Sequence, residues 1–468
     1  MLLAASTAAA QSGDDLSRRL EQVQRETRLL ASPELSPADR AVLDYGAFLT
    51  LSYFSLDVSD GAQGLNNRGV RQYDLNIYAR FSLDDAHSVY TRGRMQYRDY
   101  NAGDESGTDD DGLKGFLEEA YYRFDLARHL AAYDGRATEN NLVITAGRQF
   151  VTWASGLTLS QYLDGGLARL DLGPLGVTLL AGVTAYNTTD FDTSRPNYDT
   201  STYRGYYGAM ASYQLGRHRP YAYVLVQRDY NRDRRINVAG TDVAFDYNSH
   251  YLGLGATGSF SDQLVYTVEM VYEGGRTLSA LTFDGGGLPL PQTEDDIRAW
   301  AGVAQLDYLP GDVRRSRLGV MLAVASGDRD RGDASGTFNG NEPGTVDRGF
   351  NGLGLLPAGY AFNPPLSNLI VLKAAASTFP LADRTGPAAR LQLGAEALLY
   401  GKTVRQGPID ELTTDDRFLG TELGTFATWR VLEDLTVQAR YGVFFPGDAI
   451  FGTHTPRQFV YLSMTYSF

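Results

Sequence analysis

Large apolar side chains alternate with small or polar side chains along most of this chain. In the last ten residues every second position is apolar, at Val460, Leu462, Met464, Tyr466 and Phe468. A period of two predicts a β-strand with one apolar face and one polar face. No stretch approaches the roughly 18–20 consecutive apolar residues of a membrane-spanning helix. The pattern therefore predicts an all-β protein that would cross a membrane with strands.

Alternating segments recur from Leu43 to the end of the chain and predict about eighteen strands. Their expected starts lie near Leu43, Gly69, His87, Phe116, Asn140, Leu157, Val177, Thr202, Arg219, Tyr247, Gln263, Asp296, Arg317, Asn368, Pro387, Phe418, Asp434 and Arg457. Short connections, such as Asp84–Asp85, alternate with long ones, such as that around Gly340. This arrangement is typical of a bacterial transmembrane antiparallel β-barrel with both termini in the periplasm. Segments 127–140 and 157–172 are the least regular, which leaves sixteen strands as an alternative.

The N-terminal part of the chain differs from the rest. Residues 1–10 end in small side chains, and we expect them to be the remnant of a signal peptide. Residues 11–42 are expected to form a periplasmic helical segment, and residues 43–468 the barrel. Within Asp14–Leu30 a heptad-like pattern predicts a short helix, with spacings of four, three, four and three between Leu16, Leu20, Val23, Thr27 and Leu30. This helix would pack against the periplasmic mouth of the barrel, associate with a second copy or partner, or stay disordered.

Composition supports a membrane barrel and narrows its partners. The 468 residues include 51 Gly, 30 Tyr and 21 Phe but no Cys, and the formal net charge is −14. Aromatic residues gather near the predicted strand ends, where the girdles of a membrane barrel lie. The negative charge argues against a nucleic-acid partner. The expected surroundings are outer-membrane lipid and lipopolysaccharide, and the expected partner for insertion is the barrel-assembly machinery.

The polar faces of the predicted strands carry many arginines. Arg92, Arg94 and Arg98 share one face of a strand, and carboxylates such as Glu119 are expected on the same face of the next strand. Like charges in a channel are costly unless carboxylates or an anionic ligand compensate them. The arginines would therefore form either a bracing lattice with acidic residues or an electropositive track for an anionic substrate. The candidate lumen residues are Arg80, Arg92, Arg94, Arg98, Arg123, Arg169, Arg390 and Arg440.

The longest predicted loop, residues 327–368, is unusually apolar for a surface loop. A loop of this composition is expected to fold into or over the pore and to restrict it, because its aromatic side chains would otherwise face water. The candidate gate residues are Phe338, Phe350, Tyr360 and Phe362. An external lid without a gating role and a surface that binds a partner are the alternatives.

Signals for metal binding and catalysis are weak. The acidic loop 104–112 lacks the EF-hand spacing, so Asp104, Asp109, Asp110 and Asp111 would hold at most a loosely bound Ca²⁺ or form a solvated loop tip. The five histidines are scattered, and none shows the spacing of a metal motif: His87, His129, His218, His250 and His454. We expect neither a cofactor nor an enzymatic activity.

Short motifs carry a family resemblance. Thr145-Ala-Gly-Arg-Gln-Phe150 is followed by Asp164-Gly-Gly166, and Ala325-Ser-Gly-Asp328 opens the long loop. Together they resemble the alginate-export family of Gram-negative outer-membrane β-barrels. The resemblance implies an eighteen-stranded barrel that exports an anionic polysaccharide through an arginine-lined pore gated by loops. The last strand also resembles the insertion signal of outer-membrane barrels, in which Tyr466 and Phe468 would be the recognised aromatic residues.

The sequence thus predicts an outer-membrane channel, either a porin or an exporter. It would pass anionic or neutral poly- or oligosaccharides or small solutes, and the loop 327–368 would restrict it. The alternative is a structural anchor with a closed lumen, whose N-terminal helix mediates assembly with other copies or a periplasmic partner through residues 14–30.

Overall fold

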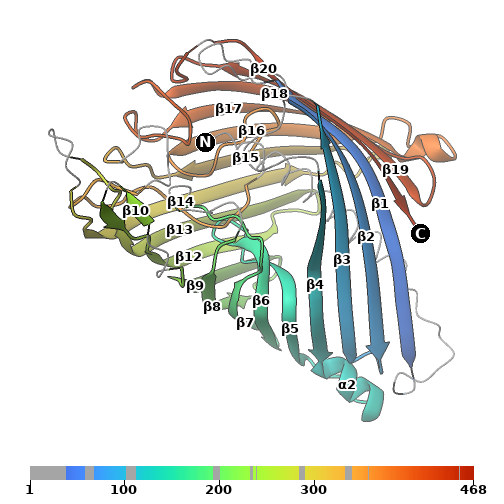
Figure 1. Ribbon diagram of the computed structural model, residues 1–468. Helices are drawn as coiled ribbons and strands as arrows, with labels where there is room; N and C mark the ends of the chain where they lie inside the picture. The colour runs from blue at the N-terminus through green and yellow to red at the C-terminus, as the bar shows by residue number, and fades with distance from the viewer. Residues whose placement is uncertain are drawn as a thin grey trace.

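Eighteen antiparallel strands run up and down around one closed wall (Figure 1). The computed structural model describes residues 38, 40–57, 68–101, 112–192, 195, 201–231, 236–238, 240–283, 290–331, 340–356, 358–452 and 454–468. The strands of the wall are β1 (Ala41–Asp57), β2 (Arg68–Leu83), β3 (His87–Tyr100), β4 (Gly112–Asp125), β5 (Asn140–Thr152), β6 (Ser160–Leu172), β7 (Leu175–Thr184), β8 (Arg204–Tyr213), β9 (His218–Asp229), β12 (Tyr247–Ser259), β13 (Leu264–Leu278), β14 (Glu294–Tyr308), β15 (Arg317–Ala325), β16 (Leu369–Thr378), β17 (Leu391–Lys402), β18 (Phe418–Arg430), β19 (Leu435–Pro446) and β20 (Arg457–Ser467). The short strands β10 (Ile236–Val238) and β11 (Thr241–Val243) form a separate hairpin in the connection between β9 and β12.

The predicted strands are confirmed, and the number of strands in the wall is eighteen rather than sixteen. The largest differences between expected and observed starts are at β4 and β17, where Phe116 and Pro387 were predicted and the strands begin at Gly112 and Leu391. The irregular segment 157–172 contains β6, which begins at Ser160. Two predicted regions, residues 1–10 and the helix at Asp14–Leu30, lie outside the described residues, as do the candidate residues Phe338, Asp104, Asp109, Asp110 and Asp111.

The barrel closes between its first and last strands. β1 and β20 pair in register from Phe48↔Ser467 to Asp57↔Gln458. Beyond this register, the N–H of Phe468 donates to the carbonyl of Ala47 at 2.9 Å, and the N–H of Ala47 donates to the carbonyl of Phe468 at 2.7 Å. The wall therefore has no free edge at the point where the ends of the barrel meet.

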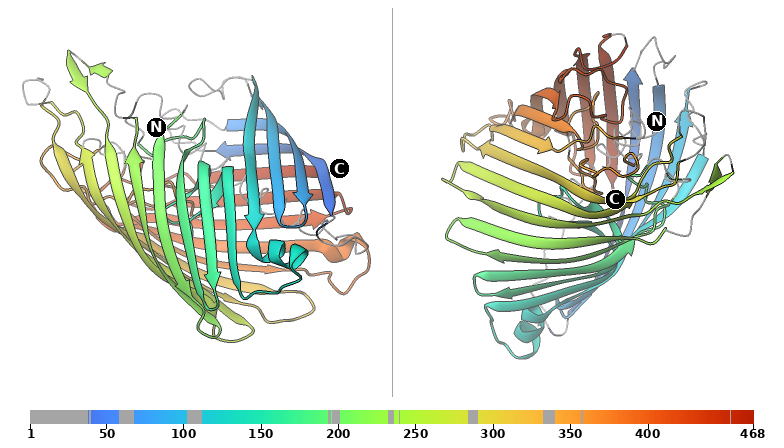
Figure 2. Two further views of the ribbon diagram at one scale, coloured as in Figure 1. Left: turned by 90° about the horizontal axis from the view of Figure 1, so that it is seen from below. Right: turned by 90° about the vertical axis from the view of Figure 1, so that its left-hand side faces the viewer.

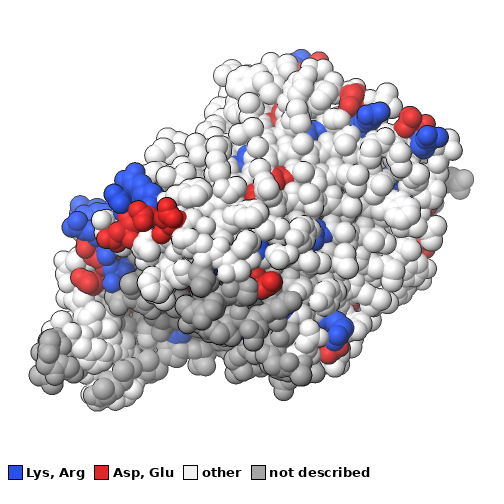
Figure 3. All heavy atoms as spheres, turned by 90° about the horizontal axis from the view of Figure 1, so that it is seen from above, with Lys and Arg blue, Asp and Glu red and all other residues white. Residues whose placement is uncertain are grey.

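Side chains alternate between the two faces of the wall as the sequence predicts. On β2 the side chains of Tyr73, Ile77 and Phe81 are exposed on the outer face, whereas Asp74 and Tyr78 are buried on the inner face. Figure 3 shows a broad outer area in which charged side chains are few, and most of them gather towards its margins. An apolar outer belt over a polar interior is the pattern of a barrel that stands in a membrane.

Short connections lie at one end of the barrel, called the short-turn end here, and long loops at the other. At the short-turn end, α2 (Leu126–Tyr133) connects β4 to β5, and the 3₁₀ helix η2 (Pro387–Arg390) precedes β17 (Figures 1 and 2). The carboxylate of Asp125 caps α2 by accepting a hydrogen bond from the N–H of Arg128 at 3.3 Å. The helix α2 was not predicted from the sequence. Among the described residues, no helix is long and apolar enough to span a membrane.

The pairing of the wall is incomplete between β4 and β5, and this place is called the seam here. Their pairing runs only from Ala120↔Arg148 to Asp125↔Val143, although both strands continue towards the long loops. Beyond the paired part, Nη1 of Arg148 donates to the carbonyl of Leu117 at 3.0 Å. A side chain thus takes over one of the backbone contacts that a neighbouring strand would have supplied.

Two tyrosines connect β9, β12 and β13 across the inner face. Tyr221 and Tyr223 lie opposite Gly255 and Gly253 of β12, and their hydroxyl groups donate to Glu269 of β13 at 2.6 and 2.8 Å. A Cβ atom on Gly253 would lie 2.1 Å from Cζ of Tyr223. The glycines therefore make room for the rings to cross β12 and reach the buried carboxylate.

The substitution Gly253→Ala tests this arrangement. We expect it to displace the Tyr223 ring, weaken its hydrogen bond to Glu269 and lower the free energy of unfolding by about 1–3 kcal/mol, as overpacking typically does. Gly115→Ala in β4 is the matched control, because no atom lies within 4 Å of a Cβ at that position. Denaturant unfolding of the two folded barrels in detergent provides the measurement, and equal midpoints would contradict the explanation.

Candidate functional site

An ion-pair network covers the inner face of β2, β3 and β4. Nη2 of Arg92 lies 2.6 Å from Glu118, and Nε of Arg94 lies 2.8 Å from Asp74. Nη1 of Arg94 also reaches Glu118 at 3.4 Å, so this carboxylate lies between the two guanidinium groups. All four side chains are buried. The bracing lattice, one of the two interpretations of the lumen arginines, is therefore what the structure contains at these two positions.

Amide side chains extend the network towards the long loops. Asp74 accepts hydrogen bonds from Nε2 of Gln72 at 2.6 Å and from Nε2 of Gln96 at 3.1 Å. Nε of Arg98 donates to Oε1 of Gln72 at 3.2 Å. Three of the predicted lumen arginines, at 92, 94 and 98, are thus held in one connected set of hydrogen bonds. Such a network is rigid only because each buried polar group has a partner.

A β-bulge decides which glutamate takes part. The register of β3 with β4 shifts between Arg92↔Glu119 and Gly93↔Leu117, which leaves Glu118 as the extra residue. Glu119 was the expected acidic residue, but Glu118 is the one that binds both guanidinium groups. Strict alternation assigns only one of two consecutive residues to the inner face, so the sequence pattern could not show this.

The other predicted lumen arginines lie elsewhere. Arg80 is on the inner face of β2 opposite Tyr90, and Arg440 is buried on the inner face of β19. The remaining three form partly exposed ion pairs near the short-turn end: Arg123 with Asp125, Arg169 with Asp171 and Arg390 with Glu433. The structure therefore does not bring the eight arginines together in one track.

One carboxylate of the inner wall binds three residues of the long loop 326–368 between β15 and β16. Glu422 of β18, fully buried, accepts hydrogen bonds from three consecutive backbone N–H groups, those of Tyr360, Ala361 and Phe362, at 2.5, 3.1 and 2.8 Å. The hydroxyl group of Tyr400 donates to the carbonyl of Phe362 at 3.0 Å. Hydrogen bonds to an ionised acceptor are the stronger kind, so this contact fixes the segment on the wall.

The same loop is also attached to a different part of the wall, at β12 and β13. The N–H of Asn351 donates to Glu273 at 2.9 Å, and the Asn351 carbonyl accepts from the hydroxyl group of Tyr251 at 2.7 Å. Nδ2 of Asn351 donates to the hydroxyl group of Tyr247 at 3.2 Å. Four strands, β14 to β17, separate β13 from β18 in the wall. The loop therefore spans the interior between these two anchors.

A third set of contacts joins the loop to the connection between β5 and β6. Ser160 donates its N–H to the carbonyl of Leu353 at 2.7 Å, and Leu355 donates to the carbonyl of Gly156 at 3.0 Å. Leu353 also belongs to the large apolar cluster of the interior, with Trp153 and Leu159 from the wall side. The part of the loop around Leu353 is thus packed as a core element rather than as a surface loop.

Three of the four candidate gate residues are held inside the barrel. Phe350 is buried against Tyr251. Phe362 stacks on Phe444 with the ring centres 4.1 Å apart. Tyr360 stacks on Phe459, and the guanidinium group of Arg440 lies 5.6 Å from its ring centre. Phe338, the fourth, is outside the described residues.

Within the loop, Arg331 and Asp347 form a buried ion pair, with Nη2 of Arg331 2.8 Å from Oδ1 of Asp347. Burial raises the pKa of Asp347 to about 6, against the opposing effect of the guanidinium group. The backbone of Asp347 exchanges hydrogen bonds with the edge of β14, donating to the carbonyl of Asp296 at 2.9 Å and accepting from Arg298 at 2.7 Å. The ion pair therefore joins the first part of the loop to its middle, and the middle is bound to β14.

The motifs that resemble the alginate-export family have clear structural roles. Arg148 forms a two-pronged ion pair with Asp164, at 2.6 and 2.7 Å, at the β4–β5 seam. Gly147 has φ +129°, and a Cβ there would lie 2.2 Å from the carbonyl oxygen of Ala120. At the start of the long loop, Asp328 accepts a hydrogen bond from the N–H of Arg348 at 2.8 Å. The motif residues thus shape the seam and the first turn of the loop.

Comparison with known proteins identifies a matching protein family and solved structures with the same fold. The family model for alginate export matches residues 178–461, more than half of the chain. No curated protein is significantly similar to the chain in sequence. Solved structures with the same fold include OccAB3 of Acinetobacter baumannii, at 15% identity and a TM-score of 0.54, over 91% of this chain and 99% of that chain. OccK9 (OpdG) of Pseudomonas aeruginosa matches at 11% identity and 0.53, and a BenF-like porin from Pseudomonas fluorescens Pf-5 at 11% and 0.52, each over 91% of this chain and 98% of that chain.

At these identities the likeness to the solved structures concerns the fold, a closed barrel of porin type. The family match is evidence beyond the shared fold. It covers the part of the chain from β7 to β20, which includes the long loop and its anchors at Glu273 and Glu422. The chain belongs to the alginate-export family.

Proposed function

We propose that this protein forms a channel in the outer membrane that passes anionic or neutral oligosaccharides or other small solutes, and that the loop 326–368 restricts it. The short-turn end would face the periplasm, and the long loops the outside, as in other bacterial barrels. Lipid and lipopolysaccharide would surround the wall, and Tyr466 and Phe468 would be recognised by the barrel-assembly machinery.

One observation gives the proposal its main support. The loop is fixed at two separate places on the inner wall, at Glu422 of β18 and at Glu273 of β13, which have four strands between them, by hydrogen bonds to its own backbone. A loop that spans a lumen narrows the path for any solute and fixes the size that can pass. Because its backbone N–H groups are bound by carboxylates, the position of the loop depends on a few wall residues that can be changed singly.

The charge of the interior supports only a modest preference for anions. Arg92 and Arg94 are compensated by Asp74 and Glu118. Arg440 differs, because it is buried beneath Tyr360 and forms no ion pair with a described carboxylate. Any guidance of anionic groups past the loop would therefore depend chiefly on Arg440 rather than on the whole predicted track.

A second candidate function, a structural anchor with a closed lumen, is favoured by a different observation. The loop is part of the large apolar cluster of the interior, and the arginine network braces the wall with paired charges. In that case the barrel would hold other components at the membrane and would conduct nothing. Conductance measurements separate the two functions.

The substitution Glu422→Gln tests the restricting loop. It replaces three hydrogen bonds to a charged acceptor, each of about 1.5–3 kcal/mol, by weaker ones. We expect larger mean conductance and more frequent current fluctuations in planar bilayers. Glu269→Gln is the matched control, because this carboxylate is equally buried but binds Tyr221, Tyr223 and Ser155 outside the loop. Silent wild-type and Glu422→Gln barrels would overturn the channel proposal in favour of the anchor.

The substitution Arg440→Gln tests the charge preference. We expect the reversal potential under a salt gradient to shift towards cation selectivity, because a buried positive charge beside the loop is removed. Arg169→Gln serves as the control, since Arg169 is an exposed arginine paired with Asp171 near the short-turn end. If both variants shift the potential equally, or if neither does, Arg440 does not determine selectivity.

A further inference from the structure

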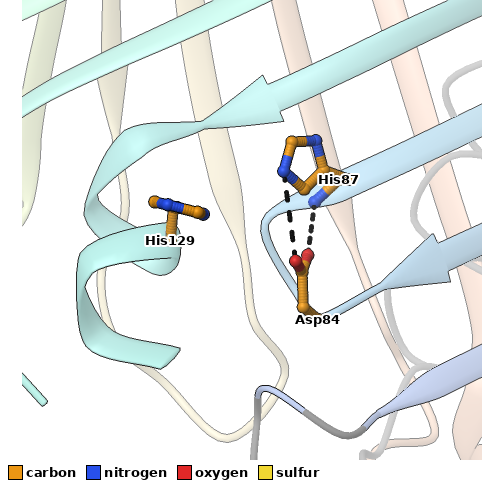
Figure 4. A group of neighbouring side chains, drawn as sticks. All are labelled: Asp84, His87 and His129. Atoms are coloured by element: carbon orange, nitrogen blue, oxygen red, sulfur yellow. Dashed lines mark hydrogen bonds and ion pairs between the residues drawn. The ribbon is translucent and has the colours of Figure 1, made fainter. Parts of the chain in front are cut away.

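Two histidines that are far apart in the sequence meet at the short-turn end of the barrel. His87 begins β3 directly after the turn that contains Asp84, and His129 lies on α2, after β4. The two regions are adjacent because β3 pairs with β4 from His87↔Phe124, and the N–H of Asp125 donates to the carbonyl of Ala86 at 3.0 Å. Figure 4 shows the imidazole rings of both histidines beside the carboxylate of Asp84.

The potential ligand atoms of these three residues form one small group. One atom from each of Asp84, His87 and His129 lies within 4.8 Å of the other two, and Nε2 of His87 is 4.0 Å from Oδ2 of Asp84. The ligands of a tetrahedral zinc ion lie about 3.4 Å apart, from bond lengths of about 2.1 Å. Side-chain rotations that move these atoms by about 1 Å therefore bring the three atoms to coordination distance.

Surrounding hydrogen bonds orient two of the three residues. Nδ1 of His87 is hydrogen-bonded to the hydroxyl group of Tyr122, which leaves Nε2 directed towards Asp84. Oδ2 of Asp84 accepts a hydrogen bond from the hydroxyl group of Tyr133 at 2.7 Å. Its Oδ1 accepts from the backbone N–H groups of Ala86 and His87 at 3.2 and 3.1 Å. Histidines that bind metals commonly have the second ring nitrogen fixed in this manner.

The third residue has an unused donor atom. Nδ1 of His129 is buried and has no hydrogen-bond partner among the described residues. Buried polar atoms in folded proteins nearly always have a partner, so this nitrogen is available to bind a ligand. A cluster that only clamped the turn to α2 by hydrogen bonds would account for Asp84, His87 and Tyr133 but would leave this nitrogen unexplained.

Burial gives the helix α2 little support beyond its hydrogen bonds to Asp84 and Asn141. It has eight residues, and none of them is buried. A helix of this length is marginal without tertiary contacts, because nucleation is costly and few hydrogen bonds follow it. A metal ion bound by His129 and by the β2–β3 turn would fasten the helix to the end of the barrel.

We propose that Asp84, His87 and His129 form a binding site for a divalent transition-metal ion, with zinc as the best fit. Two imidazole nitrogens and one carboxylate suit zinc and disfavour Ca²⁺ and Mg²⁺, which prefer oxygen ligands. Water or an incoming ligand would complete the four positions of the ion. The site lies apart from the loop 326–368 and does not depend on the proposed channel function.

Zinc titration of the full-length barrel without a polyhistidine tag tests the proposal. In detergent micelles, isothermal titration calorimetry should show one Zn²⁺ per chain, unaffected by an excess of Ca²⁺ or Mg²⁺. His129→Ala and His87→Gln should each weaken binding at least tenfold. His250→Ala is the matched control and should bind like the wild type, because His250 lies on β12, away from the cluster. Heat-modifiability on gel electrophoresis shows that each variant has folded.

Hydrogen exchange gives a readout that non-specific binding would not reproduce. Zn²⁺ should slow amide exchange in residues 126–133 of the wild type and leave it unchanged in His129→Ala. Failure of the folded wild type to bind Zn²⁺ would overturn the proposal. Undiminished binding by both His129→Ala and His87→Gln would do so equally, since the ion would then be held elsewhere.

Discussion

The structure depends on the closure of backbone hydrogen bonds around the wall. A strand surrounded by hydrocarbon has no water for its N–H and C=O groups, and each unsatisfied group costs several kcal/mol, so the first and last strands must pair. β1 and β20 do so over most of their length. Closure fixes which face of each strand is inside, and the alternation of side chains follows from it. The β4–β5 seam is the exception, and there Arg148 reaches the carbonyl of Leu117 with its side chain.

The interior shows how buried charge is used once the wall is closed. A carboxylate inside a barrel needs donors, because an unpaired charge at low dielectric is very costly. Glu118 finds them in two arginines, whereas Glu422 finds them in three backbone N–H groups of the loop 326–368. The same requirement thus braces the wall in one place and positions a loop in another. Paired arginines also present less net charge to a solute than their number in the sequence suggests.

The short-turn end is held together by different contacts from those of the interior. The turn at Asp84 is held by hydrogen bonds to its own backbone and to Tyr133 of α2. The pairing of β3 with β4 brings α2 beside this turn. Residues that show no motif in the sequence become neighbours in this way, and the end of the barrel gains a cluster of nitrogen and oxygen donors.

The sequence by itself predicted about eighteen strands, with sixteen as the alternative, nearly all of their starts and the inner or outer face of most side chains. These properties are local, because the period of two and the turn residues are set by a strand and its immediate neighbours. It also predicted that the apolar loop 327–368 would fold into or over the pore, and its residues Phe350 and Phe362 are buried. The family resemblance, read from Gly147-Arg148-Gln149 and the start of the long loop, is confirmed by the family match.

Only the tertiary structure decided which residues meet. The bulge that selects Glu118 over Glu119 depends on how β4 fits against β3, and a shift of one residue leaves no trace in the alternation. The loop binds Glu422 of β18 and Glu273 of β13, two strands with four others between them, and His87 meets His129 only through the pairing of β3 with β4. Contacts between distant parts of a chain depend on closure and register, which are properties of the whole barrel rather than of any segment.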